Sequence, residues 1–425
     1  MEEKEKTMRY NVDHLIYAAD DTLWNTVRIG ITLTEPIDAA ALRAAADRLP
    51  LRFPYFAVRL VQDGDSLFYE PNDAPFVISE DGKCVALASE ESNHHLMAFA
   101  YKGNTIYNDI SHFLMDGGGN FPVVIMLLYE YLHQVHPEEE FDLSKIPQPG
   151  DKISQEELTD HPYPTEPIPV NPLGGRRRPE KVFKLDDMPQ GYDNIGDWTS
   201  FRMKILKSEM MDYISSADGS PATFISSLIY RAISDLHPEN QLPLVCGMQH
   251  QFRKALGNLR SHSSHVRIVP IVYPNSYRNR DLDSINTLGR GSLIINADIE
   301  HDKLVVNEHI KNANRIKGLT LLEKRELMKK IVLDGIGENT FGVSYVGLIS
   351  FCGMEKYIQS FIPHIDMTLS GGLSAEIFFT GKYFDINIMQ RNSDDKYIKR
   401  IRELLAEKGI HCLMDEPEHF EICRF

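Results

Sequence analysis

A proline-rich segment near the middle of the chain most constrains how the chain can fold. Eight of the 23 prolines lie between Pro147 and Pro179, with "PYPTEPIPVNP" at the centre. Because proline fixes φ and lacks a backbone N–H, this segment is expected to be extended and poor in regular structure. We interpret it as a crossover, residues 146–196, between an N-terminal lobe (1–145) and a C-terminal lobe (197–425). A disordered interaction segment is the alternative.

Both halves show predicted strands followed by helices. In the first half, the β-like run 26–33 precedes a helix for which Asp38 is the expected N-cap. In the second half, residues 207–216 form a predicted helix, and Ser220 with Pro221 begins another. This pattern predicts an α/β chain (α+β, two-layer) of two lobes, with helices covering the sheets.

Near the C-terminus, three segments predict an antiparallel meander: "HIDMTLS", "GGLSAEIFFT" and "YFDINIMQR". "FEICRF" at the end of the chain is expected to be a last short strand.

Composition excludes several function classes. The formal net charge of −16 disfavours binding to nucleic-acid phosphates and to anionic membranes. No apolar run approaches the roughly 20 residues that cross a bilayer, and the charged N-terminal residues do not resemble a secretory signal. Five dispersed cysteines without a C-x-x-C pair are typical of reduced intracellular thiols. We therefore expect a cytoplasmic protein.

The stretch "NDISHFLMDGGGNF", residues 108–121, holds the residues best suited to chemistry. His112 lies at the end of a predicted strand, and a histidine can exchange a proton near neutral pH. Asp116 could orient the imidazole or pair with a buried cation. Gly117 to Gly119 would permit positive φ and a close approach of substrate. A helix is expected to begin near Asn120, with Pro122 in its first turn.

"HFLMDG", His112 to Gly117, matches the H-x-x-x-D-G motif and resembles the chloramphenicol acetyltransferase-like superfamily, which includes condensation domains and stand-alone alcohol acetyltransferases. Three further segments occur in the order found in that superfamily: "IDAAALRAAADRLP", "RFPYF" and "SPATFISSLIYRAI". The resemblance covers about residues 10 to 410 and is strongest to the stand-alone alcohol acetyltransferases.

The resemblance implies two lobes with mixed sheets and a tunnel between them. It implies that His112 is the general base that activates an acceptor hydroxyl for direct attack on an acyl thioester. Acetyl- or acyl-coenzyme A would be a co-substrate, with no permanently bound cofactor. Asp116 would be structural, paired with an arginine for which Arg59 and Arg253 are candidates, and Gly117 would keep the loop tight.

Departures from the superfamily pattern refine these expectations. Ser111 precedes His112 where condensation domains usually carry a second histidine, which favours an alcohol acceptor. An amine acceptor and an acyl carrier protein as donor stay open. "VSYVG", residues 343 to 347, is similar to an S-N-x-G strand, so Ser344 and Tyr345 are candidates for the oxyanion donor or the tunnel wall. A non-catalytic or carrier-docking binding module is the competing function, and a monomer is expected.

Three other motifs have simpler interpretations. Arg176 to Arg178 could meet coenzyme A phosphates, but a solvated loop is favoured. His262 and His265 in "HSSH" lack a metal-site context, so no metal site is predicted. Asp13 and His14 are expected to be a surface pair.

Overall fold

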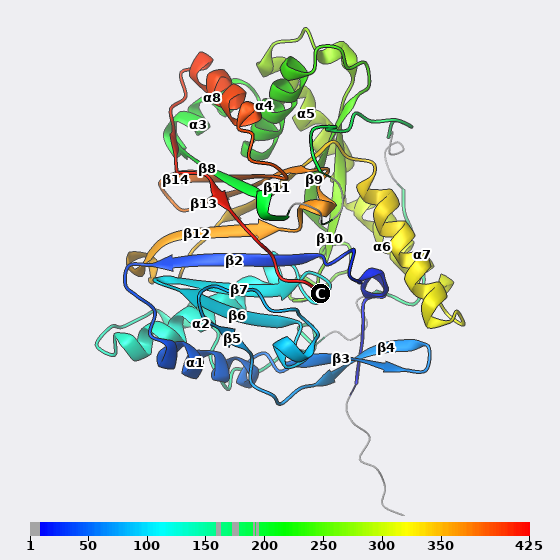
Figure 1. Cartoon of the computed structure of the whole chain (residues 1–425). Helices are drawn as coiled ribbons and strands as arrows, with labels where there is room; N and C mark the ends of the chain where they lie inside the picture. Colours follow the sequence, from blue (N-terminus) through cyan, green and yellow to red (C-terminus); the bar gives the residue numbers. More distant parts are fainter. Residues whose placement is uncertain (1–8, 159–162, 172–177, 190–191, 193–194) are drawn as a thin grey trace, which may run out of the picture.

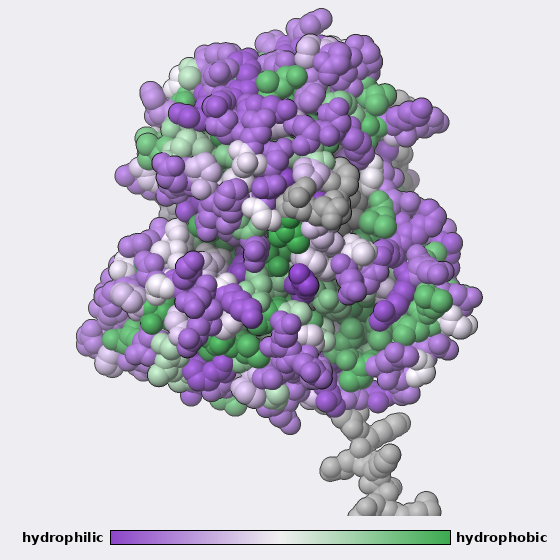
Figure 2. All heavy atoms as spheres, in the orientation of Figure 1, coloured by the Kyte–Doolittle hydropathy of each residue, from purple (hydrophilic) through white to green (hydrophobic). Residues whose placement is uncertain are grey.

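The structure is a computed structural model that describes residues 9–158, 163–171, 178–189, 192 and 195–425. Two sheet-based halves lie one above the other in Figure 1, each with helices on its outer side. Figure 2 shows hydrophilic residues over most of this face and hydrophobic residues gathered between the two halves. No helix in the described part of the chain combines the length and apolarity needed to span a membrane.

The lower half in Figure 1 is built on a five-stranded sheet in the order β12-β2-β7-β6-β5. Helices α1 and α2 lie on its outer side, and a separate small sheet has the order β1-β4-β3. The elements of this half are β1 (Tyr10–Asn11), η1 (His14–Ala18), β2 (Thr26–Leu33), α1 (Ala39–Arg48), β3 (Val58–Asp63), β4 (Ser66–Pro71), β5 (Ile78–Ser79), β6 (Met97–Lys102), β7 (Thr105–Ser111), α2 (Gly117–Val135) and β12 (Ile358–Ile365).

The upper half is built on an eight-stranded mixed sheet in the order β10-β9-β11-β13-β14-β8-β15, with β16 also paired to β8. Helix α7 reaches down to η1 in the lower half. The elements are β8 (Thr199–Leu206), α3 (Lys207–Ser216), α4 (Pro221–Leu236), β9 (Leu244–Gln251), β10 (Val266–Tyr273), α5 (Leu282–Asn296), α6 (Ile299–Arg315), α7 (Leu321–Ile336), β11 (Phe341–Leu348), β13 (Leu373–Phe379), β14 (Tyr383–Gln390), α8 (Lys396–Glu407), β15 (Cys412–Met414) and β16 (Glu418–His419).

The α/β prediction is confirmed, and several elements lie where local sequence patterns put them. Strand β2 spans residues 26–33 and helix α3 spans residues 207–216. Helix α4 begins as predicted, because Ser220 caps it and Pro221 occupies its first turn, where a missing N–H costs nothing.

The predicted C-terminal meander is wrong in its first segment. Strands β13 and β14 pair antiparallel. Of "HIDMTLS", only His364 and Ile365 lie in a strand, the end of β12, which pairs antiparallel with β2 in the other half, and Met367–Leu369 form the short helix η8. The reason is burial, because Phe351, Met354 and Phe361 around β12 belong to the apolar core of the lower half. "FEICRF" is also not a strand, since the last strand ends at His419.

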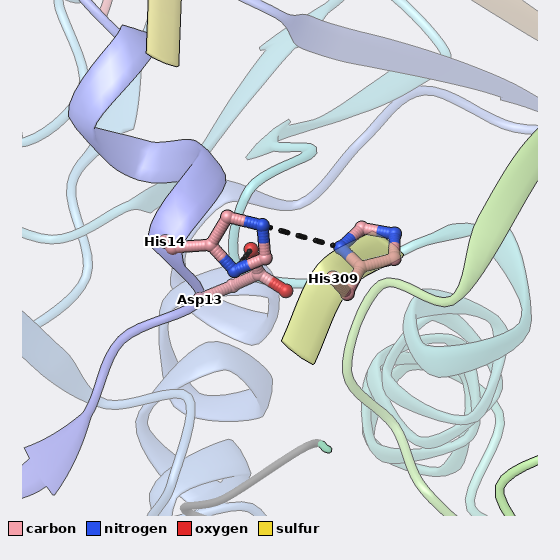
Figure 3. Close-up of side chains that lie close together, drawn as sticks. All are labelled: Asp13, His14 and His309. Atoms are coloured by element: carbon pink, nitrogen blue, oxygen red, sulfur yellow. Dashed lines mark hydrogen bonds and ion pairs between the residues drawn. The ribbon is translucent and has the colours of Figure 1, made fainter. Parts of the chain in front are cut away.

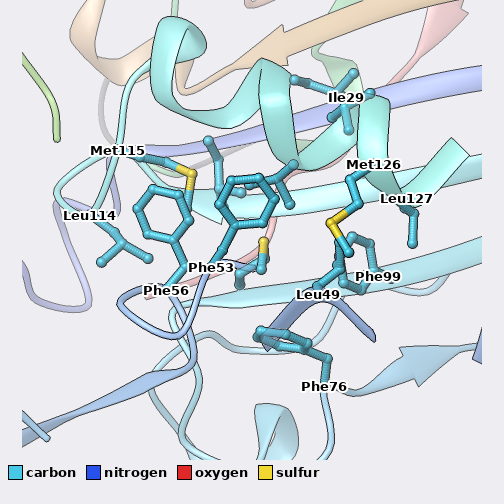
Figure 4. Close-up of a cluster of buried hydrophobic side chains, with 14 of the residues drawn as sticks. Ile29, Leu49, Phe53, Phe56, Phe76, Phe99, Leu114, Met115, Met126 and Leu127 are labelled. Carbon is cyan, nitrogen blue, oxygen red and sulfur yellow. The ribbon is translucent and has the colours of Figure 1, made fainter. Parts of the chain in front are cut away.

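That core holds the segment between the two candidate catalytic residues. Figure 4 shows Leu114 and Met115 pointing into a cluster with Phe53 and Phe56. Both side chains are buried, as is Phe113. The three residues between His112 and Asp116 therefore anchor the loop to the core.

The pairing of β12 with β2 predicts that the first half does not fold cleanly alone. A fragment of residues 1–196 would lack β12 and expose the outer edge of β2, which invites pairing between chains. We expect this fragment to aggregate or to elute as oligomers in size-exclusion chromatography, whereas the full chain does not. A monomeric fragment with cooperative thermal unfolding would contradict this prediction and would support independent lobes with a boundary near residue 197.

Candidate active site

Asp116 lies at the junction of the two halves and joins them. Its Oδ1 atom lies 2.6 Å from Nη2 of Arg253, two residues after the end of β9. The same oxygen accepts a hydrogen bond of 3.0 Å from the backbone N–H of Gly119 and so caps α2. Its Oδ2 atom accepts a hydrogen bond of 2.9 Å from the backbone N–H of His265. The carboxylate therefore binds its own helix and two positions of the other half.

These contacts keep Asp116 ionised although it is buried. Burial alone would raise the pKa of this carboxyl, but the charge and hydrogen bond of Arg253 and the N–H of His265 outweigh it, so the pKa is lowered. Arg253 also donates to the carbonyl oxygens of Ser261 at 2.8 Å and Ser263 at 2.9 Å. The buried guanidinium is thus hydrogen-bonded as well as ion-paired.

Residues 261–265 form a loop that surrounds this ion pair, and its role could not be inferred from the sequence. Its two histidines suggest metal ligands, but the loop contacts the ion pair through its backbone. Backbone carbonyls of the loop accept hydrogen bonds from Arg253, and the backbone N–H of His265 donates to Asp116. The hydroxyl of Ser264 lies 3.2 Å from Nδ1 of His112. His262 and His265 have pKa values near 4 because burial disfavours their charged forms.

His112 directly follows β7, and its position is fixed from both sides. Its backbone N–H donates to the carbonyl of Asn25 at 2.8 Å, and its ring lies against Ser264. Burial lowers the pKa of His112 below 6.5, and the charge of Asp116 only partly offsets this effect. The ring is therefore neutral at pH 7 and can accept a proton.

His112 is one wall of a cavity of about 690 Å³ between the two halves. The lower half contributes residues around Asp13, Asn25 and His112, and the upper half contributes residues of β9, β10, α6 and α7. Cavities of several hundred Å³ are typical of small-molecule sites. The arrangement places the neutral imidazole of His112 in a space large enough for a substrate.

The glycine run does not do what the sequence suggests. None of Gly117, Gly118 and Gly119 has a positive φ, because they form the first turn of α2, three residues earlier than expected. Pro122 lies inside the helix and not in its first turn. A Cβ on Gly119 would lie 1.9 Å from the carbonyl oxygen of His262, whereas one on Gly117 would meet nothing within 4 Å. Close packing against the 261–265 loop thus requires glycine at Gly119, and a Cβ on Gly118 would be tight against Oδ1 of Asp116 at 3.3 Å.

None of the other predicted site residues, Arg59, Ser344 and Tyr345, is among the described residues that line the cavity. Arg59 is half exposed and pairs with Glu70 at 3.2 Å, and the arginine that pairs with Asp116 is Arg253. Ser344 hydrogen-bonds to Glu376, a buried carboxyl whose pKa is raised by burial to about 7.

Two further motifs lie at the cavity wall or outside the described part of the chain. Arg178 lines the cavity and forms an ion pair with Glu338, while Arg176 and Arg177 lie outside the described residues. Asp13 and His14 are not a surface pair, because His14 is 4% exposed and Asp13 lines the cavity.

Solved structures decide the fold. Superposition on F. sporotrichioides TRI101, complexed with coenzyme A and T-2, gives a TM-score of 0.61 at 12% identity, covering 96% of this chain and 100% of that one. Polyketide synthase associated protein 5 from Mycobacterium tuberculosis gives 0.57 at 13%, covering 94% and 96%. The condensation domain of the Monacolin K polyketide synthase MokA gives 0.53 at 11%, covering 95% and 97%.

The chain has the chloramphenicol acetyltransferase-like fold. No protein family model and no curated protein matches the sequence itself. The similarity therefore lies in the arrangement of the chloramphenicol acetyltransferase-like elements over almost the whole chain, at an identity that shows the fold alone.

Replacing Asp116 by Asn should mainly damage stability. The amide can still cap α2, but it leaves Arg253 as a buried charge without a counter-ion, which typically costs about 3–5 kcal/mol of unfolding free energy. Chemical denaturation of Asp116→Asn measures this loss. Arg59→Met is the matched control, because Arg59 is half exposed and Glu70 keeps its second partner, Arg9, at 2.7 Å, so the loss should be smaller. Equal losses in the two variants would contradict the role assigned to the buried pair.

The glycine run gives a second stability prediction. Gly119→Ala forces a Cβ into the carbonyl of His262 and should lower the unfolding free energy by about 1–3 kcal/mol, as overpacking does. Gly117→Ala meets no neighbour and should leave it unchanged or raise it by up to about 1 kcal/mol. Thermal unfolding of both variants compares them directly; the reverse order of stability would show that the 261–265 loop moves away easily.

Proposed function

We propose that this protein is an acyltransferase that moves an acyl group from a coenzyme A thioester to an acceptor hydroxyl, with His112 as general base. The observation that carries the proposal is a neutral imidazole at the wall of a cavity between two halves. The fold supports it, because structures with this arrangement include TRI101 complexed with coenzyme A and an acceptor-sized mycotoxin.

The proposed reaction needs one proton acceptor and no covalent enzyme intermediate. The mechanism uses the tautomer in which Nδ1 of His112, 3.2 Å from the hydroxyl of Ser264, carries the proton and the Nε2 lone pair faces the acceptor. Nε2 takes the hydroxyl proton while the acceptor oxygen attacks the thioester carbonyl carbon. The tetrahedral intermediate collapses, the C–S bond breaks, and the thiolate receives the proton from the imidazolium.

Asp116 does not take part in this proton transfer. Both of its oxygens are bound to Arg253, Gly119 and His265, so it acts as a positioning residue for the loop that carries His112. Ser264 is a second positioning residue, because it touches the ring nitrogen that does not face the acceptor.

The test is release of free thiol from acetyl-coenzyme A in the presence of a panel of alcohols, with a parallel panel of amines. His112→Ala should lose about 10²–10⁴-fold in kcat/KM, the usual contribution of a general base. His133→Ala is the matched control, because His133 is exposed on α2 and stacks only on Tyr129. Equal turnover by wild type and His112→Ala would sink the mechanism. A wild type without turnover but with binding of a thioester-loaded carrier protein would favour a docking module.

The pH profile provides an independent check on the base. Only the neutral imidazole can accept a proton, so kcat/KM should rise with pH through the pKa of His112 in the free enzyme. Because burial lowers this pKa below 6.5, the activity should be fully present at pH 7 and should fall only on acidification below about 6.5. A half-maximal rate above pH 7 would show that another group is the base.

A further inference from the structure

A second group of titratable side chains lies on the wall of the same cavity and has no part in the proposed reaction. Asp13 and His14 come from the start of η1, and His309 comes from α6 in the upper half. Figure 3 shows the two imidazole rings facing each other with the carboxylate beside them. One donor atom of each residue can be chosen so that all three lie within 4.8 Å of one another.

We propose that Asp13, His14 and His309 form a binding site for a divalent transition-metal ion of the zinc class. Two imidazole nitrogens and one carboxylate oxygen are a common three-ligand set for such an ion. Three protein ligands also leave a coordination position open. Because Asp13 and His309 both line the cavity, a molecule in the cavity could reach that position.

The spacing of the two imidazoles fits this interpretation. Nε2 of His14 lies 3.3 Å from Nδ1 of His309. Two nitrogens bound tetrahedrally to one zinc ion, each at about 2.0–2.1 Å, are separated by roughly 3.4 Å. An ion would therefore replace the hydrogen bond between the rings. The one proton between them would move to the far nitrogen of its own ring. Oδ1 of Asp13 lies 3.5 Å from the other nitrogen of His14, Nδ1, so the carboxylate would have to turn toward Nε2 to complete the ligand set.

Neighbouring groups hold the three ligands in place, as outer contacts do in metal sites. The hydroxyl of Tyr163 donates to Oδ2 of Asp13 at 3.0 Å, and the N–H of Leu15 donates to Oδ1 at 2.8 Å. The ring of Tyr163 stacks on that of His309, with centroids 4.5 Å apart and planes at 10°. Phe252 stacks on His309 at 5.6 Å.

A comparison with another cluster in the described residues shows why this one is favoured. Cys84, Asp109 and Cys423 are equally close to one another. However, the guanidinium of Arg28 lies 2.6 Å from Sγ of Cys84 and 3.3 Å from Oδ1 of Asp109. That cluster already contains a guanidinium, whereas Asp13 interacts with the side chains of His14, His309 and Tyr163 and with no arginine or lysine among the described residues.

The experiment uses the tag-free full chain, freed of metal with a chelator and titrated with Co²⁺ while its visible absorption is recorded. The wild type should bind one ion per chain with a spectrum of nitrogen and oxygen coordination. Asp13→Asn and His309→Ala should weaken binding by more than the ~10–100-fold that an outer-contact change costs. His411→Ala, an exposed histidine remote in sequence from the cluster, is the matched control and should bind like the wild type.

Zn²⁺ should also raise the Tm of the wild type and of His411→Ala but not of His309→Ala, because only an intact site couples binding to folding. Asp13→Asn keeps an oxygen for the N–H of Leu15, so it remains informative if His309→Ala folds poorly. Absence of Co²⁺ uptake by the wild type, or uptake by His309→Ala equal to that of the wild type, would overturn the proposal and leave a hydrogen-bonded Asp–His–His chain. Neither outcome depends on acyl transfer, so the two proposals fail separately.

Discussion

The ion pair between Asp116 and Arg253 is the interaction on which the rest of the site depends. A buried pair is stable only when its remaining donors and acceptors are satisfied. Here the carboxylate also binds the N–H groups of Gly119 and His265, and the guanidinium also binds two carbonyls of the 261–265 loop. One pair thus fixes the start of α2, the residues after β9 and the start of β10.

The elements that local sequence patterns predict are those whose determinants lie within a few residues. Ser220 and Pro221 specify the start of α4, and alternating apolar residues specify β2. The sequence predicts a strand at "HIDMTLS", but the strand of this region, β12, ends at Ile365 and pairs with β2 in the other half. Its place is decided by Phe361 and its neighbours, which fill the core beneath β2. That packing joins residues more than 300 positions apart, which no short window can detect.

The residues of the candidate site also fall into two groups, those that a short motif predicts and those that only the fold brings together. The motif from His112 to Gly117 identified the loop, but two arginines were equally good partners for Asp116 on sequence grounds, and only the fold separates Arg253 from Arg59. The glycines were assigned to a turn because glycine permits positive φ. The structure assigns Gly119 to a close contact with His262, a residue from the other half. The cluster of Asp13, His14 and His309 was missed because short spacings cannot relate residue 14 to residue 309.

The choice of arginine as the partner of Asp116 has a consequence for the chemistry at His112. An isolated Asp116 carboxylate would stabilise the imidazolium, raise the pKa of His112 and leave less of the neutral base at pH 7. Its charge does act in that direction, but the charge of Arg253 acts in the opposite one and burial dominates both. Arg253 therefore allows an ionised carboxylate to hold the loop without protonating the base. A histidine partner for Asp116 could not have done this, because its charge would vanish over the pH range in which the base must work.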